Sequence, residues 1–421
     1  MMTAPARQDS TFYTHQLPNG LQLLGQHMPG TVSAASIFWV RTGTRDETAR
    51  TMGVSHFLEH MAFRRSQTMT QKEIDGAFER MGAEYNAATW LEMTYFWARV
   101  LASEAPRSIQ ILSELTHPML DQDDFDQERL VILEEIARFK DQPAQILFDH
   151  FMEDFFRSHP LSWETLGTPE TIKELTVEEM REYWNRRYGA SNMLFAIAGN
   201  FDWDTVVAQI GELTSLWDSG TSSREIIPVS FESSFNVYTD ERFAQEQFAI
   251  GTPSLDRSDP RYYAAAVLAT ILGDDTGSRL FWALHETGLA ESATSNVMVF
   301  EGAGLFLTHL STEPGQAAKA LETVRSELAR LQTGDISEDE LDRAKAKIIS
   351  SVVIGGESTN DRVMGLIRSW LSYHSLETLH DLRQKIEAVT VDDLRELLAA
   401  YPVGPDQVIV ASGPAAAESL V

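Results

Sequence analysis

The sequence predicts an α+β protein made of two similar halves, each an antiparallel-rich mixed sheet with flanking helices. Three observations support this prediction. The chain has 421 residues, which is long for one hydrophobic core and suits two. Hydrophobic residues make up 43% of it, so each half can bury a core. The order of strand-like and helix-like segments in the first half recurs after a small, polar break.

The break divides the chain into two expected domains. It runs from Asp218 to Glu225, contains small and polar residues, and is closed by Pro228. This composition is typical of a linker. We therefore expect an N-terminal domain over residues 1–217, a linker over 218–228 and a C-terminal domain over 229–421.

Apolar periodicity and turn residues predict the elements of the first half in order. A turn at residues 17–21 joins two strands, and a strand-like run follows at 32–41. Residues 84–100 are rich in aromatic and β-branched side chains, which suits a hairpin. A buried strand is expected at 192–199. The expected helices cover residues 53–63, 71–81, 104–116, 123–140, 148–156 and 177–187.

The second half repeats this outline. Strands are expected near 235–251, near 293–312 and at 407–412. Helices are expected near 260–287, 314–332 and 338–353.

Charge and composition disfavour several classes of protein. A formal net charge of −28 argues against binding to nucleic acid or to an anionic membrane surface. The chain has no cysteine, so any metal must be held by His, Asp or Glu. We see no apolar segment of signal-peptide length at the N-terminus and no apolar run long enough to span a membrane. These features predict a soluble, cytoplasmic protein.

The most informative motif is His56-Phe-Leu-Glu59-His60. Residues at i and i+4 share one helix face, so His56 and His60 point the same way with Glu59 beside them. Two neutral imidazoles bind a divalent transition metal, most commonly zinc. A neighbouring carboxylate can take a proton from metal-bound water. The motif can also arise by chance on a structural helix, and a metal site needs a third ligand.

A helix over residues 126–140 offers candidates for that ligand. It carries Glu128, Glu134 and Glu135, and the first and last of these are seven residues apart, on nearly one face. We expect the apolar side chains of this helix to be buried, namely Leu130, Val131, Leu133 and Ala137. The alternative is a charged face on a surface helix, with no ligand among the three acids.

With these residues in view, the chain resembles the pitrilysin/insulinase family of zinc peptidases, the inverzincins. It is most similar to the shorter members typified by mitochondrial processing peptidase subunits and their bacterial relatives. Glu135 follows His60 at the family's spacing, and Glu128 matches a second family glutamate. Other matching stretches are Leu17–Leu21, Gly43 with Arg45 and Glu47, Gly82–Ala87, Gly167-Thr168, Ser278-Arg279-Leu280 and Ile386–Thr390.

The resemblance implies a metalloendopeptidase that binds one Zn²⁺ per chain through His56, His60 and Glu135. Glu59 would be the general base on zinc-bound water, and Glu128 an auxiliary carboxylate. The resemblance also implies that the two halves form half of a clamshell.

The substrate implied by the resemblance is an extended peptide. Asn86 and Ala87 would lie on an exposed strand edge, to which the peptide adds as an extra strand.

The second half departs from the family pattern. Active relatives carry an Arg and a later Tyr that anchor the substrate, whereas this chain has His285 and Glu291 at those positions. The chain therefore resembles the zinc-bearing member of a two-chain enzyme. We expect a heterodimer with a homologous chain that supplies the Arg/Tyr pair, with a homodimer as the alternative. We expect His285 to be a surface or packing residue.

A non-catalytic role as a structural subunit of a larger assembly remains the competing function. Family members of that kind usually have eroded zinc motifs, whereas His56, Glu59, His60 and Glu135 are all present here. A serine hydrolase is disfavoured because the sequence has no Gly-x-Ser-x-Gly motif.

Overall fold

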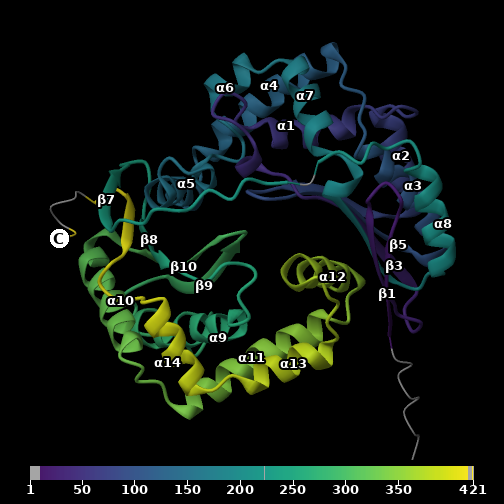
Figure 1. Cartoon of the computed structure of the whole chain (residues 1–421). Coiled ribbons are helices and arrows are strands. Elements are labelled where there is room, and N and C mark those ends of the chain that lie inside the picture. The colour runs from purple at the N-terminus through teal and green to yellow at the C-terminus, as the bar shows by residue number, and fades with distance from the viewer. Residues whose placement is uncertain (1–9, 222, 416–419, 421) are drawn as a thin grey trace, which may run out of the picture. The chain divides into compact units, whose positions relative to one another are not determined.

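The computed structural model describes residues 10–221, 223–415 and 420 (Figure 1). These residues form two compact units, each with one mixed sheet and flanking helices, which confirms the predicted α+β class. Unit 1 contains the described residues of Met1–Ile136, Trp163–Glu225 and Ile354–Glu377, and unit 2 contains those of Ala137–Ser162, Ile226–Val353 and Thr378–Val421.

Two segments belong to a different unit from their neighbours in the sequence. Residues 137–162 precede the predicted linker but lie in unit 2, whereas residues 354–377 follow it but lie in unit 1. Neither unit is one continuous stretch of chain, so the two units do not test the linker at residues 218–228. That linker stays a prediction.

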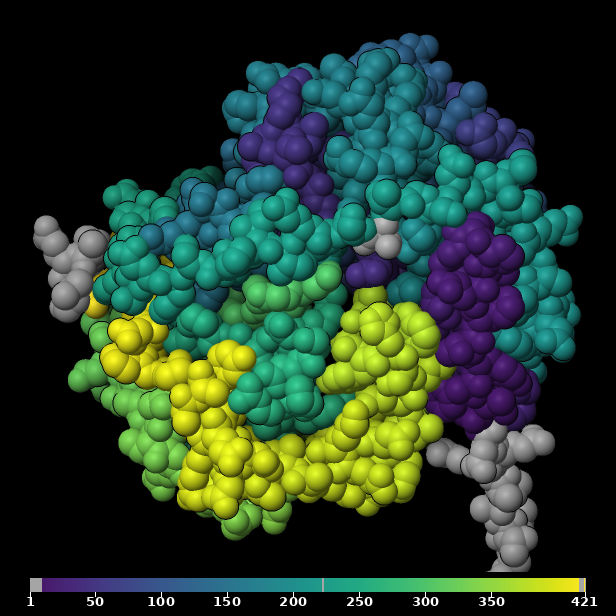
Figure 2. All heavy atoms as spheres, viewed as in Figure 1, coloured from purple at the N-terminus to yellow at the C-terminus, as the bar shows by residue number. Residues whose placement is uncertain are grey.

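Unit 1 is built on a six-stranded sheet in the order β1-β2-β6-β3-β5-β4. Only β2 and β6 pair in parallel, and all other neighbours are antiparallel. β1 is an edge strand with mostly exposed side chains, and the purple N-terminal residues lie at the surface in Figure 2. The strands are β1 (Thr11–Gln16), β2 (Gln22–His27), β3 (Ser33–Val40), β4 (Glu84–Thr89), β5 (Thr94–Leu101) and β6 (Met193–Gly199).

Helices cover both faces of this sheet. Five of the six helices predicted for the first half agree with the observed bounds within one residue, whereas the helix predicted at 148–156 begins earlier, at Pro143. The pattern missed α6, α8 and α12. On one face lies a large apolar core that includes α1 and α3, and on the other α12 packs against β2, β3 and β6. The helices of unit 1 are α1 (Val54–Arg64), α2 (Gln71–Met81), α3 (Ala105–Leu115), most of α4 (Gln122–Phe139), α6 (Pro169–Glu174), α7 (Val177–Arg187), α8 (Trp203–Leu213) and α12 (Thr359–Tyr373).

Unit 2 is built on a five-stranded sheet in the order β7-β11-β8-β10-β9. β7 and β11 are parallel, and α5 packs against β8 and β11. The strands are β7 (Ser234–Thr239), β8 (Glu246–Pro253), β9 (Ser292–Phe300), β10 (Ala303–Thr312) and β11 (Val408–Gly413). The helices are α5 (Pro143–Phe156), α9 (Tyr262–Leu272), α10 (Ala317–Gln332), most of α11 (Glu338–Gly355), α13 (Leu379–Ala388) and α14 (Val391–Ala400).

The described residues include no helix with the length and apolar character that a membrane span requires.

The packing of α12 on the sheet of unit 1 leads to a prediction. Leu366 is 3% exposed among side chains from β2, β3 and β6. Leu366→Ala should therefore destabilise unit 1 by about 2–5 kcal/mol through lost burial and a cavity. Hydrogen–deuterium exchange should show β3 amides exchanging at least about tenfold faster, while β10 amides of unit 2 keep their rate.

Leu216→Ala is the matched control, because Leu216 is 95% exposed and surface truncations change stability by less than about 0.5 kcal/mol. Equal exchange of β3 in the two variants would contradict the assignment of α12 to unit 1.

Candidate metal centre

Helix α1 begins at a tightly constrained turn. Gly53 has φ of 92°, and a Cβ built there would lie 2.7 Å from the carbonyl oxygen of Leu166. Both the left-handed backbone and the close approach therefore require glycine. The backbone N–H of Gly53 donates to Glu47 Oε2 at 2.7 Å, and that of Ser55 donates to Glu47 Oε1 at 2.8 Å. Glu47 thus caps the N-terminus of α1 with both carboxylate oxygens.

Glu47 is buried, with 6% of its surface exposed. Burial raises the pKa of its carboxyl group to about 8, while the hydrogen bonds from Ser55 and Gly53 act in the opposite direction. Those hydrogen bonds offset part of the free energy that burying the carboxyl group costs.

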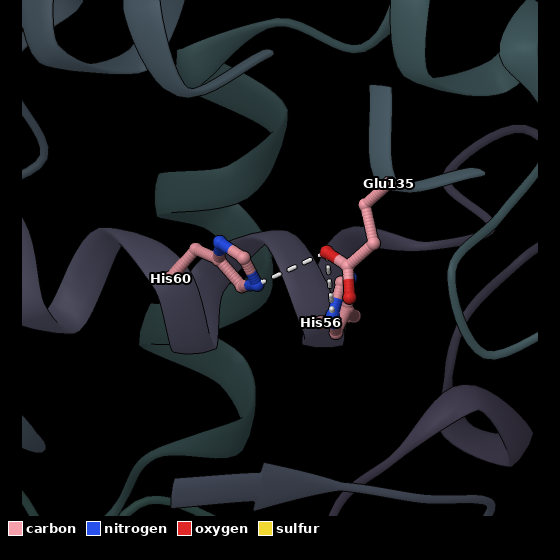
Figure 3. Close-up of side chains that lie close together, drawn as sticks. All are labelled: His56, His60 and Glu135. Carbon is pink, nitrogen blue, oxygen red and sulfur yellow. Dashed lines mark ion pairs between the residues drawn. The ribbon is translucent and has the colours of Figure 1, made fainter. Parts of the chain in front are cut away.

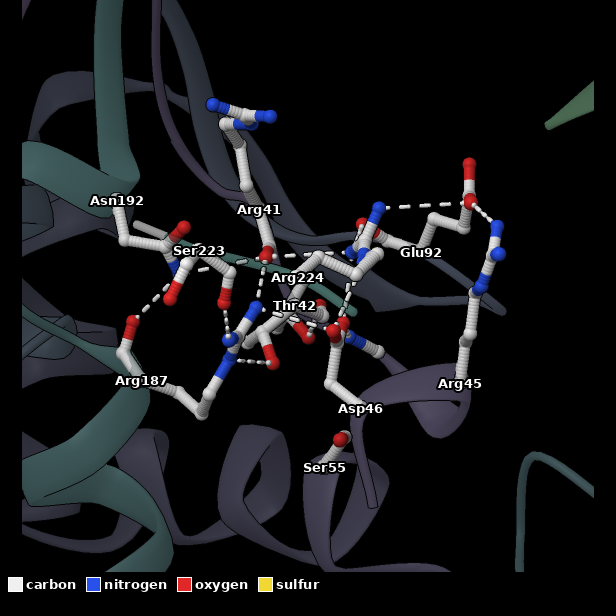
Figure 4. Close-up of polar contacts among 12 residues, drawn as sticks. Arg41, Thr42, Arg45, Asp46, Ser55, Glu92, Arg187, Asn192, Ser223 and Arg224 are labelled. Carbon is white, nitrogen blue, oxygen red and sulfur yellow. Dashed lines mark hydrogen bonds and ion pairs between the residues drawn. The ribbon is translucent and has the colours of Figure 1, made fainter. Parts of the chain in front are cut away.

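A buried network of ion pairs holds the loop that leads into α1 (Figure 4). Arg45 Nη1 lies 2.5 Å from Glu92 Oε1, and Asp46 accepts from both Arg187 at 3.0 Å and Arg224 at 2.7 Å. Each of these five side chains is at most 7% exposed. Because Arg224 follows β6 and α8 in the chain, the network fixes the end of the Trp163–Glu225 segment of unit 1 to the loop before α1.

The two faces of α1 differ in character. The inward face carries Phe57, Leu58, Met61 and Ala62, which are all buried. His56 and His60 share the other face, with ring centroids 4.6 Å apart.

Helix α4 places a third side chain opposite the two histidines. It is held against α1 by Phe125, whose ring stacks on Phe57 with centroids 4.4 Å apart. Glu135 Oε2 lies 3.7 Å from His56 Nε2 and 3.4 Å from His60 Nε2 (Figure 3). The three candidate ligand atoms all lie within 4.8 Å of one another.

This geometry fits a zinc ion. With zinc–ligand distances of about 2.0–2.1 Å, neighbouring ligand atoms of a tetrahedral site lie about 3.3 Å apart, close to the separations from Glu135 to each ring. His60 Nδ1 lies 2.8 Å from Glu128 Oε1. Since a carboxylate only accepts, that contact places the proton on Nδ1 and leaves the lone pair of Nε2 facing Glu135.

The charge of the site also fits a divalent cation. Glu59, Glu128 and Glu135 bring three carboxylates together, and Arg64 Nε lies 2.6 Å from Glu128 Oε2. When all are ionised, two negative charges remain uncompensated. A divalent metal ion supplies the matching charge.

The pKa values at the site reflect this crowding. Burial, together with the neighbouring His60, lowers the pKa of His56 to about 3. Burial alone would lower the pKa of His60, but the hydrogen bond to Glu128 and the charges of Glu135, Glu128 and Glu59 raise it overall. Burial raises the pKa of Glu59, although a hydrogen bond with Thr89 and the charge of His60 partly oppose that rise.

The predicted peptide-binding strand lies at the edge of the sheet in unit 1. β4 stands at the end of the strand order and pairs with β5. Asn86 is exposed and Ala87 is 7% exposed. The backbone N–H of Ala87 donates to Asn86 Oδ1 at 2.9 Å, and Thr89 of the same strand reaches Glu59.

Comparisons with known proteins identify the family. Residues 23–169 match the family described as Insulinase (Peptidase family M16), and residues 174–348 match the Peptidase M16 inactive domain. A protein of Streptomyces coelicolor, described as an uncharacterized zinc protease, is 31% identical over 390 residues that cover 90% of this chain and 84% of that protein.

This chain belongs to peptidase family M16.

Other relatives agree. A zinc protease of Mycobacterium leprae, also described as uncharacterized, is 32% identical to this M16 chain over 389 residues, 90% of this chain and 87% of that protein. A crystal structure of a Helicobacter pylori protease has a TM-score of 0.88 at 22% identity, covering 96% of this chain and all of that one. A chain of Candida albicans complex III has a TM-score of 0.83 at 19% identity, covering 97% of each. At these identities, the two structures show the shared fold.

The structure corrects the predicted burial of α4. Leu130 and Val131 are 64% and 41% exposed, Ala137 is also exposed, and Leu133 is only half-buried. The buried residues are Phe125, Glu128, Ile132 and Ile136. Because α4 turns Glu128 and Glu135 toward α1, its buried apolar side chains are those that share that face.

Glu134, His285 and Glu291 all lie at exposed positions. Glu134 is exposed, unlike its neighbour Glu135. His285 and Glu291 belong to unit 2, and both are exposed. The ring of His285 stacks on Phe281, and its Nδ1 lies 2.9 Å from the carbonyl oxygen of Glu291. This agrees with the expectation of a surface or packing histidine.

Sequence reasoning did not assign functions to Glu47 and Arg64, although both support the centre. For Arg64 a signal was present, because it follows His60 by four residues and so lies on the same face of α1. For Glu47 the signal was weak, since a carboxylate six residues before Gly53 is outside the usual capping positions.

The cap on α1 leads to a prediction. Glu47→Gln replaces one of the two acceptor oxygens with an NH₂ group, which leaves one buried N–H without a partner. The loss should destabilise the start of α1 by about 1–3 kcal/mol. Hydrogen–deuterium exchange of residues 54–64 should accelerate accordingly.

Glu73→Gln is the matched control, since Glu73 accepts the backbone N–H of Thr70 in an exposed capping box of α2. That variant should leave exchange in α1 unchanged. Unaltered exchange of α1 in Glu47→Gln would show that Glu47 does not hold the helix.

Proposed function

We propose that this chain is a zinc-dependent metalloendopeptidase that hydrolyses peptides or unfolded segments. One zinc ion per chain would be held by His56, His60 and Glu135. The observation that carries the proposal is the convergence of these three side chains from α1 and α4, with the carboxylate of Glu59 beside them. The relatives described as zinc proteases support the same function.

The residues of the chain divide the chemistry among them. Zinc in such a site acts as a Lewis acid that makes water more acidic and polarises a carbonyl oxygen. Glu59 takes a proton from the attacking water and later returns it to the leaving amine. Glu128 binds the ring of His60 on the side away from Glu135, so its role is to orient that ligand.

Strand β4 is the proposed platform for the substrate. An extended peptide would pair with this edge, next to Thr89 and therefore next to Glu59. Pairing at Ala87 requires Asn86 Oδ1 to release the N–H that it now accepts. Main-chain pairing discriminates little between side chains, so broad specificity follows.

Substrate anchoring is proposed to need a second chain. His285 and Glu291 replace the Arg and Tyr that the family uses, and neither offers the same donor with a fixed positive charge. A homologous chain that carries the pair would complete the enzyme, as a heterodimer. A homodimer with a different anchor is the alternative.

Three glutamine variants test the proposed chemistry. Glu59→Gln should keep its zinc, because Glu59 is not a ligand, but should lower peptide cleavage by about 100-fold or more. Glu135→Gln should lose zinc, as measured by metal analysis after gel filtration. Glu134→Gln, next to the ligand but exposed, should match the wild type in both measurements.

The outcomes separate the mechanism from the site. Cleavage that persists in Glu59→Gln would rule out the general base, and a wild-type chain free of zinc would rule out the metal centre. Zinc binding without cleavage of any peptide, alone or with partner chains, would favour the alternative role as a non-catalytic subunit.

A mixing experiment tests the need for a partner. The purified chain alone should cleave an unstructured peptide slowly, and a homologous chain with the Arg/Tyr pair should raise kcat/KM at least tenfold. Native mass spectrometry should then detect a one-to-one complex. Equal activity with and without every candidate partner would contradict the two-chain proposal.

A further inference from the structure

Arg64 occupies a position on α1 that extends the line of metal-binding residues. It follows His60 by four residues, as His60 follows His56, so the three side chains lie along one helix face. The side chain of Arg64 is 22% exposed, and its Nε lies 2.6 Å from Glu128 Oε2.

Glu128 divides its two oxygens between a metal-binding residue and Arg64. Oε1 lies 2.8 Å from His60 Nδ1, and Oε2 lies 2.6 Å from Arg64 Nε. The carboxylate is only 8% exposed. A carboxylate at this depth needs a cation for compensation, and removal of one partner of such a pair leaves an uncompensated buried charge.

Arg64 is itself held from a third helix. Its Nη1 donates to Gln71 Oε1 at 3.0 Å, and Gln71 is the first residue of α2. The contacts therefore run from Gln71 through Arg64 and Glu128 to His60, and they join α2, α1 and α4.

The adjacent arginine offers a close comparison. Arg65 Nε lies 2.9 Å from Asp124 Oδ2, so it also pairs with an acid on α4. Asp124 lies one turn before Glu128. Among the described residues, the candidate metal ligands include neither Asp124 nor its partner Arg65. Both arginines thus form ion pairs with acids of α4, and Arg65 Nε also donates a hydrogen bond there, whereas the contact of Arg64 Nε is an ion pair alone. Only the ion pair of Arg64 involves an acid that contacts His60.

We propose that Arg64 is a positioning residue for the metal centre. It holds Glu128 in place and compensates its charge, so that Glu128 in turn fixes the ring of His60 with Nε2 toward the metal. The inference rests on the proposed function, because it assumes that His60 binds zinc.

The test measures the zinc affinity of the full chain by competition with a chromophoric chelator. Arg64→Met removes the charge but keeps most of the apolar stem, and should weaken zinc binding by about 10- to 100-fold, as for other residues that orient a ligand. Arg64→Lys keeps the charge and should recover part of the loss. Arg65→Met should stay within about twofold of the wild type.

Each outcome has a distinct meaning. Equal affinities of Arg64→Met and the wild type would overturn the inference, and so would equal losses in Arg64→Met and Arg65→Met, which would indicate a general structural effect. Thermal unfolding of the metal-free variants checks folding, and if Arg64→Met does not fold, the comparison of Arg64→Lys with Arg65→Lys decides. A wild-type chain that does not bind zinc would instead refute the proposed function.

Discussion

The centre depends on the compensation of negative charge at partly buried positions. Glu59, Glu128 and Glu135 are brought together by the packing of α1 on α4, and their carboxylates would repel one another without cations. Arg64 compensates one of them. The remaining charge, together with two imidazoles on the same face, would favour a divalent ion at this position.

This arrangement requires a precise origin for α1. A helix that began one residue later would turn His56 and His60 by about 100°, away from Glu135. Gly53 and the cap by Glu47 fix the first turn, while the ion pairs of Asp46 and Glu92 hold the preceding loop. These contacts give the buried carboxylates of Asp46, Glu47 and Glu92 a structural role in positioning α1.

Much of the centre could be predicted from local pattern. The spacing of His56 and His60 fixes a shared face once the segment is helical, and Phe57, Leu58 and Met61 make it amphipathic. Glu135 required more, because nothing local separates it from Glu134. The spacing between His60 and Glu135, which is recognised only through the family resemblance, selects Glu135 as the candidate ligand.

Other features depend on tertiary packing that a single sequence does not contain. The prediction that Leu130 and Val131 are buried in α4 is wrong, because apolar side chains alone do not reveal a helix face that turns acidic side chains inward. The packing of α12 against the sheet of unit 1 could not be predicted either, because hydrophobic periodicity identifies the apolar face of a helix but not the surface that covers it. The ion pair between Arg64 and Glu128 joins residues that are 64 positions apart, and only the fold brings them together.

The location of the supporting residues is relevant to the proposed two-chain enzyme. The candidate ligands, Glu59, Glu128, Arg64 and the cap on α1 all belong to unit 1. His285 and Glu291, which the proposal places where the family carries its Arg and Tyr, belong to unit 2. The contacts described for the candidate ligands, Glu128 and Arg64 all lie within unit 1. The proposed two-chain enzyme requires such a separation, because the chain that lacks the substrate anchor must still keep its metal ligands.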